Sequence, residues 1–357
     1  MRAPMPSREL GERVPGLIAV GGHPAVDMPE HVVAAAAEAA RRPRYAPTRG
    51  LPELREAIAR EHGVDPEQNV LVTAGGMQGL YLAARAFGAR TATHAPSFFF
   101  PQLVEAAGGR CAVARDWDEL AALVDAKTSL VIVNTPVNPT GYAFREHDLD
   151  AIAAALERTD ALLLSDEAYH GLLWDGVPHL SPLSHPALRE RTLVLRSFSK
   201  TFAMAPWRVG YAVGPADAIE TLARELAWQA LAVDGVAQAA AHAALTGPRA
   251  WLDAAIAELA AMRPLAVAAA NDAGLAARLP EGCAFVWAVV DGDDEEWSER
   301  LAREHGIPAV AGRHFHASTP HVRIPFGGRP EARDALLDAL ASLAARRRDA
   351  RPSAARP

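Results

Sequence analysis

Between residues 45 and 235, short apolar runs alternate with segments whose apolar positions have helical spacing. The apolar runs predict strands, in chain order Val70–Thr73, Ser129–Val133, Ala161–Leu164, Thr192–Leu195 and Val209–Val213. Apolar positions at helical spacing lie between them, for example at Met77–Phe87 and Glu146–Leu156. Strands separated by helices favour an α/β fold with a mostly parallel, doubly wound sheet that is covered on both faces.

The last third of the chain has a different pattern. Arg249–Met262 and Pro330–Ala345 predict amphipathic helices, and between them lie three strand-like runs, Ala284–Val290, Ile307–Ala311 and His321–Pro325. We therefore expect a large domain at 41–237 and a smaller α+β domain made of 1–40 and 238–345. Residues 346–357 are rich in Arg and Pro, and we expect them to form a disordered tail.

Composition narrows the possible classes of protein. A length of 357 residues fits two domains, and no apolar run approaches the roughly 20 residues of a membrane-spanning helix. The net charge of -7 argues against nucleic acid as the main partner. Cys111 and Cys283 lie far apart, in no metal-like spacing. Since Met1–Leu10 lacks the apolar core of a signal peptide, we expect a cytoplasmic protein.

Polar, glycine-rich or ionisable residues follow four of the predicted strands. They are Gly75–Gly76, Asn134–Gly141, Asp166–Tyr169 and Ser197–Lys200. Ligands of doubly wound sheets bind beyond the carboxyl ends of the strands, so these segments are expected to meet at one edge.

Two of these segments suit a phosphorylated carbonyl cofactor. Lys200 can form a Schiff base if its amine is desolvated, and the planar fork of Arg208 suits a phosphate. Ala74–Gln78 lies between a strand and a helix, where free N–H groups bind anions. The alternatives are two surface cations and an ordinary turn.

Asp166 ends an apolar strand, where a buried carboxylate needs a cation or hydrogen-bond donors. A protonated pyridine nitrogen is one such partner, and a helix N-cap is the alternative role. Pro96–Pro101 is aromatic, and one of its rings could stack on a planar cofactor. A dinucleotide site is disfavoured, because no Gly-x-Gly-x-x-Gly followed by an acidic residue is present.

In their order and spacing, these motifs resemble the fold-type I pyridoxal-phosphate enzymes, in particular the class I/II aminotransferase family. The resemblance runs from about Gly21 to Phe326. It implies that Lys200 is the Schiff-base lysine and that Asp166 pairs with the pyridine nitrogen. Asn138 and Tyr169 are similar to the pair that hydrogen-bonds the phenolic oxygen of the cofactor, and Phe98 falls where a ring stacks on the pyridine.

The same resemblance implies the remaining binding residues. The phosphate cup would consist of Gly75, Gly76, Met77, Ser197, Ser199 and Arg208. Tyr45 is similar to the tyrosine that reaches the phosphate of a partner subunit, which implies a homodimer with shared active sites. Arg323 resembles the arginine that grips the substrate carboxylate, with Asn138 and the backbone of Gly22 beside it.

The resemblance implies a ping-pong aminotransferase that moves an amino group from an L-amino acid to a 2-oxo acid through a Lys200 aldimine. Lys200, Asp166 and Tyr169 would be its catalytic residues. A lyase, a cyclase or an oxidase that uses pyridoxal phosphate on the same fold is the alternative. A cofactor-sensing regulator would need a fused DNA-binding segment, and only 20 residues precede Gly21.

The sequence departs from the family pattern on the substrate side. The usual Pro-Gly is replaced by Ala311-Gly312, followed by Arg313, His314 and His316, and His23 follows Gly22. Arg313 in this loop would favour an acidic side chain on the substrate, whereas a surface arginine paired with a carboxylate is the rival interpretation. For the three histidines a structural or surface role is expected rather than a metal site. The amino donor and acceptor are not identified by the sequence.

Overall fold

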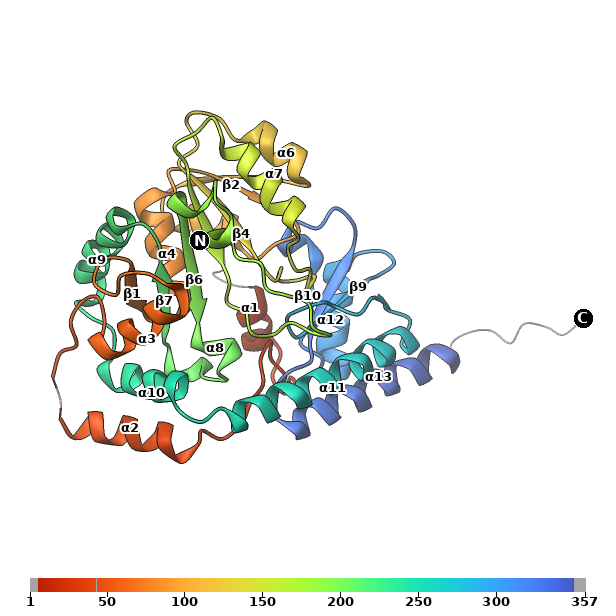
Figure 1. The fold of residues 1–357 in the computed structure, drawn as a ribbon. Helices are drawn as coiled ribbons and strands as arrows, with labels where there is room; N and C mark the ends of the chain where they lie inside the picture. The colour runs from red at the N-terminus through yellow and green to blue at the C-terminus, as the bar shows by residue number, and fades with distance from the viewer. Residues whose placement is uncertain (1–5, 43, 350–357) are drawn as a thin grey trace, which may run out of the picture.

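The computed structural model describes residues 6–42 and 44–349, and a seven-stranded sheet lies at the centre of its larger part (Figure 1). The strand order is β1-β7-β6-β5-β4-β2-β3. The strands are β1 (Val70–Thr73), β2 (Arg90–His94), β3 (Arg110–Ala114), β4 (Leu130–Asn134), β5 (Leu162–Asp166), β6 (Thr192–Ser197) and β7 (Gly210–Val213). β7 runs antiparallel to β1 and β6, and the other pairs are parallel. The prediction of a mostly parallel sheet is confirmed.

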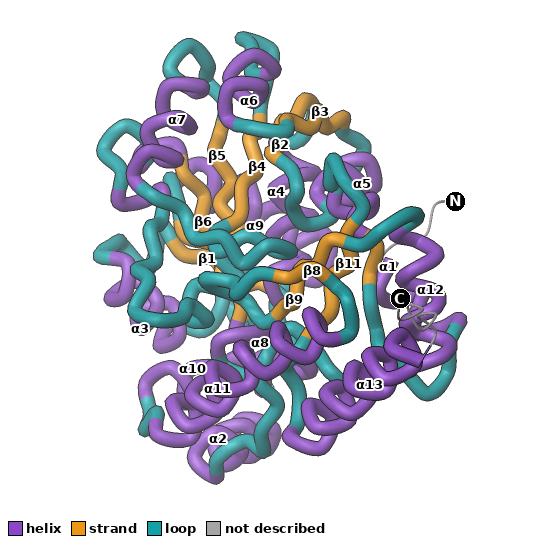
Figure 2. The backbone as a smooth tube through the Cα atoms, turned by 90° about the vertical axis from the view of Figure 1, so that its right-hand side faces the viewer, coloured by secondary structure: helices purple, strands orange, loops and turns teal. Residues whose placement is uncertain are grey.

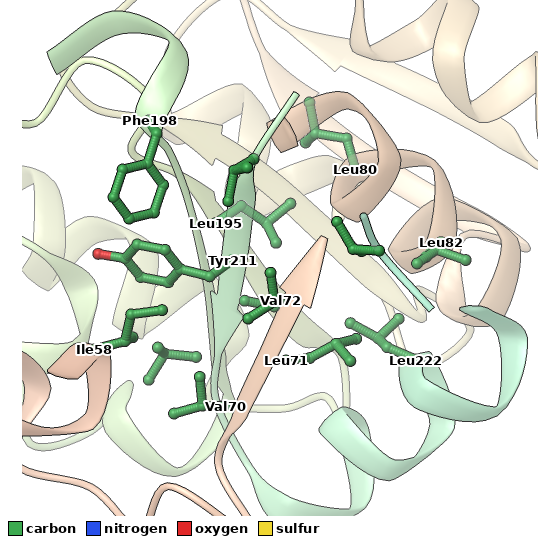
Figure 3. Packing of buried hydrophobic residues seen from close by; sticks show 14 of the residues in the cluster. Ile58, Val70, Leu71, Val72, Leu80, Leu82, Leu195, Phe198, Tyr211 and Leu222 are labelled. Carbon is green, nitrogen blue, oxygen red and sulfur yellow. The ribbon is translucent and has the colours of Figure 1, made fainter. Parts of the chain in front are cut away.

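Helices cover both faces of this sheet because the central strands are apolar on both sides. In β4, Leu130 and Ile132 belong to one buried cluster, whereas Val131 and Val133 belong to another. The helices on the first face include α3 (Pro52–His62), α4 (Gly75–Phe87) and α9 (Ala216–Ala230). Figure 3 shows Ile58, Leu80 and Leu222 of these helices around the side chains of β1. The helices on the second face include α6 (Trp117–Leu123) and α7 (Glu146–Leu156).

The smaller part is an antiparallel sheet of four strands in the order β10-β11-β9-β8. These strands are β8 (Ala276–Ala277), β9 (Phe285–Val289), β10 (Val310–Ala311) and β11 (His321–Pro325). They pack with α11 (Ala250–Asp272), α12 (Asp294–His305) and α13 (Pro330–Asp349). Figures 1 and 2 show the long helix α13 along one side of this part. The predicted α+β arrangement of the last third is therefore present.

Three boundaries differ from the expectations. α11 continues ten residues past Met262, through Pro264, because Ala266, Val267 and Ala270 stay buried. α13 continues to Asp349, so the helix includes the first four residues of the expected tail, and 350–357 lie outside the described residues. Three arginines in its last turn suit the negative end of the helix dipole.

The third difference concerns two helices expected in the smaller domain. α2 (Glu30–Arg41) and α10 (Gly235–Thr246) contact each other and bury Val32, Ala36, Ala240 and Ala241 in the core of the larger sheet. The N-terminal helix α1 (Pro6–Arg13) instead packs through Leu10 on Ala302 of α12. The core of the larger sheet therefore includes α2 and α10 and continues to Leu252 at the start of α11.

Two short helices complete the frame around the carboxyl ends of the strands. They are α5 (Phe100–Ala106) and α8 (Phe198–Thr201). Among the helices of the described ranges, none combines the length and the apolar character needed to cross a membrane.

Candidate active site

A cavity of about 560 Å³ lies where the carboxyl ends of three neighbouring strands meet the smaller sheet. Asn134, Asp166 and Ser197 are the last residues of β4, β5 and β6, and all three line the cavity. The ladder pairs Asn134 with Asp166, which places both at the same level of the sheet. Phe285 and Arg323 of the smaller sheet form the opposite wall. The expectation that the strand ends gather at one edge is met.

The cavity brings together the predicted site residues except Gly75, which lies just behind it, and Tyr45. Those that line it are Gly22, Gly76, Met77, Phe98, Asn138, Asp166, Tyr169, Ser197, Ser199, Lys200, Arg208 and Arg323. They come from segments that are up to 301 residues apart (323 − 22).

Lys200 enters the cavity from α8, the short helix after β6. The side chain of Ser197 caps this helix by accepting a hydrogen bond from the backbone N–H of Ser199, at 3.1 Å. The Nζ atom of Lys200 lies 5.7 Å from the ring centre of Tyr169. Burial, and then the charges of Arg323 and Arg208, lower the pKa of Lys200 to about 8. The lowered pKa gives this amine a larger neutral fraction near neutral pH than an exposed lysine has, which suits a nucleophile and base.

Asp166 is a buried carboxylate at the floor of the cavity. Its Oδ1 atom accepts a hydrogen bond from the backbone N–H of Ala168 at 3.1 Å. Burial raises its pKa to about 6, although Ala168 and Lys200 act in the opposite direction. Within the described part of the chain, no lysine or arginine forms an ion pair with Asp166. A cationic ring nitrogen in the cavity would supply the missing partner, so Asp166 fits a protonated pyridine.

The start of α4 forms an anion-binding corner. Gly75 has a φ of +74°, and a Cβ atom there would lie 2.5 Å from Nη2 of Arg208. Only glycine leaves room for this guanidinium beside the free N–H groups of the first helical turn. Arg208 donates from Nη1 to Oγ of Ser199 at 3.2 Å and to the carbonyl oxygen of Ala205 at 2.8 Å. These donors fit a phosphate group.

Arg323 provides a second anion-binding group in the opposite wall. Its guanidinium lies 4.3 Å from the ring centre of Phe285 and 4.7 Å from that of Phe315. Nη1 donates to Oδ1 of Asn138 at 2.8 Å, whereas Nε is buried without a hydrogen-bond partner. Burial lowers the pKa of Arg323 to about 10, so the side chain is still charged at neutral pH. A carboxylate would satisfy this buried cation.

Gly22 allows the chain to pass close to Phe285 and Tyr169 in the wall of the cavity. A Cβ atom on Gly22 would lie 2.5 Å from Cζ of Phe285 and 3.0 Å from the hydroxyl oxygen of Tyr169. A side chain at this position would therefore intrude on the cavity. The backbone of Gly22 is available as a contact instead.

Tyr45 is the one predicted site residue that lies away from the cavity. Its side chain is 84% exposed, and it borders a separate hollow beside α2 and α10. Within one chain it contacts none of the groups described above. The side chain of Tyr45 is therefore free to contact another molecule.

The loop after β10 does not extend into the cavity. Arg313 pairs with Asp293 at 2.7 Å and with Asp294, and half of its side chain is exposed. His314 pairs with Glu295 at 2.8 Å, and His316 does not line the cavity either. The rival interpretation, a surface arginine paired with carboxylates, describes Arg313 correctly.

His23 does border the cavity. Its Nδ1–H donates to the carbonyl oxygen of Pro24 at 2.7 Å. Burial, and then the charge of Lys200, lower its pKa below 6.5, so the imidazole is neutral at pH 7.

Sequence reasoning missed a buried ion network on the other side of β5. Glu167 is fully buried and lies 2.9 Å from Nη2 of Arg196 and 2.9 Å from Nε2 of His179. Burial raises the pKa of this carboxyl, but the hydrogen bond and charge of His179 and the charge of Arg196 outweigh it and hold the pKa well below its usual range. Successive residues of a strand point to opposite faces, so Asp166 and Glu167 belong to two different environments. The Asp-Glu pair after an apolar run was the available signal.

Several apolar lining residues were missed as well, and no local signal identifies them. They include Leu10, Val20, Phe285, Pro308, Val310 and Pro325. The described residues contain no group of three or more His, Cys, Asp and Glu side chains that could hold a metal ion.

Comparison with known proteins places this geometry in a family. A family model described as aminotransferase class I and II matches residues 21–340. The aromatic-amino-acid aminotransferase 2 of Thermococcus litoralis is 30% identical, over 93% of this chain and 92% of its own. The aspartate/prephenate aminotransferase of Thermus thermophilus is 33% identical, over 95% and 94%. The crystal structure of an aromatic aminotransferase from Pyrococcus horikoshii matches with a TM-score of 0.85 at 28% identity, over 96% of this chain and 99% of that chain.

These matches confirm the family that the motifs resemble. The relatives are named aminotransferases, which supports transamination over the elimination, cyclisation or oxidation left open above. Members of the family use pyridoxal phosphate, and the amine, carboxylate and phosphate-binding groups of the cavity fit that cofactor. The chain therefore belongs to the class I and II aminotransferases and is a pyridoxal-phosphate-dependent enzyme that transfers amino groups.

Proposed function

We propose that this enzyme transfers the amino group of an L-amino acid to a 2-oxo acid by a ping-pong reaction, with Lys200 as its Schiff-base lysine. The observation that carries the proposal is the presence of Lys200 and Asp166 in the lining of one cavity. Burial lowers the pKa of the amine to about 8 and raises the pKa of the carboxyl to about 6. The lowered pKa suits Lys200 to exchange protons near neutral pH, and the buried carboxyl of Asp166 suits a cationic ring nitrogen as its partner.

Bound pyridoxal phosphate supplies an electron sink for the bond that breaks at the α-carbon of the substrate. Lys200 would hold the cofactor through Nζ until a substrate amine takes its place, and the free Nζ would then serve as the base that takes the α-proton and as the acid that returns it. Asp166 stabilises the protonated ring nitrogen by its negative charge. Tyr169 and Asn138 line the same cavity and hydrogen-bond the phenolic oxygen in this proposal.

Two arginines divide the anionic groups between them. Arg208, together with Ser199 and the first N–H groups of α4, holds the phosphate. Arg323 holds the substrate carboxylate, which would complete the hydrogen bonding of its unpartnered Nε. The backbone of Gly22 and the side chain of Asn138 adjoin the same carboxylate.

We also propose a homodimer in which Tyr45 completes the phosphate site of the partner subunit. Three large side chains, Tyr45, Trp228 and Leu231, are 84%, 93% and 52% exposed in the single chain. Exposed aromatic and aliphatic side chains of this size are typical of subunit interfaces. A cytoplasmic location remains part of the proposal, supported by two free cysteines, and cell fractionation would test it.

Substitution of the proposed Schiff-base lysine tests the function directly. The chain has only two lysines, Lys200 and the exposed Lys127. Lys200→Ala should abolish transamination while pyridoxal phosphate still binds without a covalent bond. Lys127→Ala is the matched control and should keep wild-type turnover. Turnover that survives Lys200→Ala would reject the proposed role.

A further inference from the structure

The part of the cavity next to Arg323 has apolar walls. Val310 stands directly opposite Arg323 in the ladder of β10 and β11, so the two side chains are neighbours on one face. Phe285, which flanks the guanidinium, also lines the cavity. Leu10 and Val20, from the N-terminal segment, line the same cavity. The substrate side chain therefore meets hydrocarbon beside the group that binds its carboxylate.

Each charged residue that lines the cavity is already assigned to the cofactor or to the substrate carboxylate in the proposed function. Among the described lining residues they are Asp166, Lys200, Arg208 and Arg323. Three of these serve the cofactor, which leaves Arg323 for one carboxylate. His23 adds no positive charge, because its imidazole is neutral at pH 7. A second carboxylate on the substrate would thus have no cationic partner in this part of the chain, and a cationic side chain would have no free carboxylate.

Arg313, the cation that the sequence suggested for this end of the cavity, is held outside it. The backbone N–H of Arg313 donates to Oδ2 of Asp294 at 2.9 Å, and its guanidinium pairs with Asp293 at 2.7 Å. Two acidic partners neutralise it. Arg313 therefore does not offer a site for an acidic substrate side chain.

From these walls we infer that the enzyme selects amino acids with an apolar side chain, and that Leu10 of α1 is a specificity-determining residue. The inference rests on the proposed roles of Lys200 and Arg323. It goes beyond them because it names the class of amino donor and a residue that selects it.

Leu10 is held in place by contacts between α1 and α12. It is 3% exposed and packs with Val14 and with Ala302 of α12. Arg13 of the same helix pairs with Glu299 at 2.7 Å. α1 is thus attached to the smaller domain, and the side chain of Leu10 forms a defined apolar wall rather than an adaptable one.

A single-turnover comparison of amino donors tests the substrate class. The holoenzyme is mixed with leucine, phenylalanine, aspartate or lysine, and the loss of the absorbance of the internal Schiff base is followed. We expect leucine and phenylalanine to react with a kcat/KM at least about 100-fold above that of aspartate or lysine, because burial of an unpaired charge is strongly unfavourable. Aspartate or lysine within tenfold of the apolar donors would overturn the inference.

This experiment separates two kinds of failure. If no amino acid reacts, or if Lys200→Ala reacts as the wild type does, the proposed function fails. If amino acids react through Lys200 but the acidic or basic donor is preferred, only the inference about the substrate class fails.

Leu10→Ala, with Val14→Ala as its matched control, tests the specificity residue. Both substitutions shorten an apolar side chain of the same buried cluster, but only Leu10 lines the cavity. We expect Leu10→Ala to change the ratio of kcat/KM for leucine and phenylalanine by roughly tenfold in favour of the larger ring. Val14→Ala should leave the ratio unchanged. Equal ratios in the two variants would show that Leu10 does not form the wall. Leu10→Arg tests the same wall with a larger, charged side chain, and it should raise the relative rate with aspartate by at least about tenfold.

Discussion

Removal of the guanidinium of Arg323 should damage the reaction with amino acids far more than the binding of the cofactor. In Arg323→Ala, the substrate carboxylate would lose a charged partner in a site from which water is largely excluded. The guanidinium donates from Nη1 to Asn138, but its Nε–H has no acceptor and is therefore available to a carboxylate.

The magnitude follows from the number of hydrogen bonds that are lost. A hydrogen bond to a charged group contributes about 1.5–3 kcal/mol, so a bidentate contact is worth about 3–6 kcal/mol. At 1.36 kcal/mol for each factor of ten, kcat/KM should fall by about 10²–10⁴-fold. The fold itself should lose much less, because Arg323→Ala also removes the cost of a buried cation.

A substrate without a carboxylate provides the control assay. For Arg323→Ala and wild type, kcat/KM is measured with an apolar amino acid and with the primary amine that lacks only its carboxylate. We expect the variant to lose rate with the amino acid and to match the wild type with the amine. Arg208→Ala should instead raise the dissociation constant of pyridoxal phosphate. Equal losses for amino acid and amine, or the same phenotype in both variants, would refute the separate roles.

Three further predictions concern pH, stability and assembly. The lowered pKa of Lys200 means that its amine is neutral above about pH 8, so the rate of covalent pyridoxal-phosphate uptake by the apoprotein should rise as pH increases through 8, and a flat profile would contradict this. Glu167→Ala removes the carboxylate partner of Arg196, whose side chain is largely enclosed, and should lower the free energy of unfolding in urea by about 3–5 kcal/mol. The exposed Glu190→Ala should change it by less than about 0.5 kcal/mol. Light scattering should give about twice the mass of one chain, and Tyr45→Ala should weaken cofactor binding although Tyr45 is exposed in the single chain; unchanged affinity would count against shared sites.

The cofactor side of the cavity could be predicted from the sequence because it depends on local order. Asp166 and Lys200 follow apolar strands, and parallel strands bring their carboxyl ends to one edge of a sheet. The glycines at the start of α4 needed no tertiary information either, since a strand-to-helix turn already places N–H groups at that edge.

The substrate side could not be predicted in this way. Leu10, Phe285 and Val310 lie on three segments with no motif, and only the packing of α1 and the smaller sheet brings them together. Arg313 was misleading, because its spacing from Arg323 suggested the cavity while Asp293 and Asp294 hold it at the surface. Long-range ion pairs of this kind leave no periodic signal.

Covalent trapping measures the central claim, the attachment of the cofactor to Lys200, most directly. The holoenzyme is reduced with borohydride and digested, and the pyridoxyl group is mapped by mass spectrometry. Since Lys127 is the only other lysine of the chain, a pyridoxyl group on a lysine can be on Lys127 or Lys200 alone. The label should appear on the peptide that contains Lys200 at about one group per chain, and Lys200→Ala should abolish it. A pyridoxyl group on Lys127 or on the N-terminal amine of the holoenzyme, with Lys200 unmodified, would contradict the assignment.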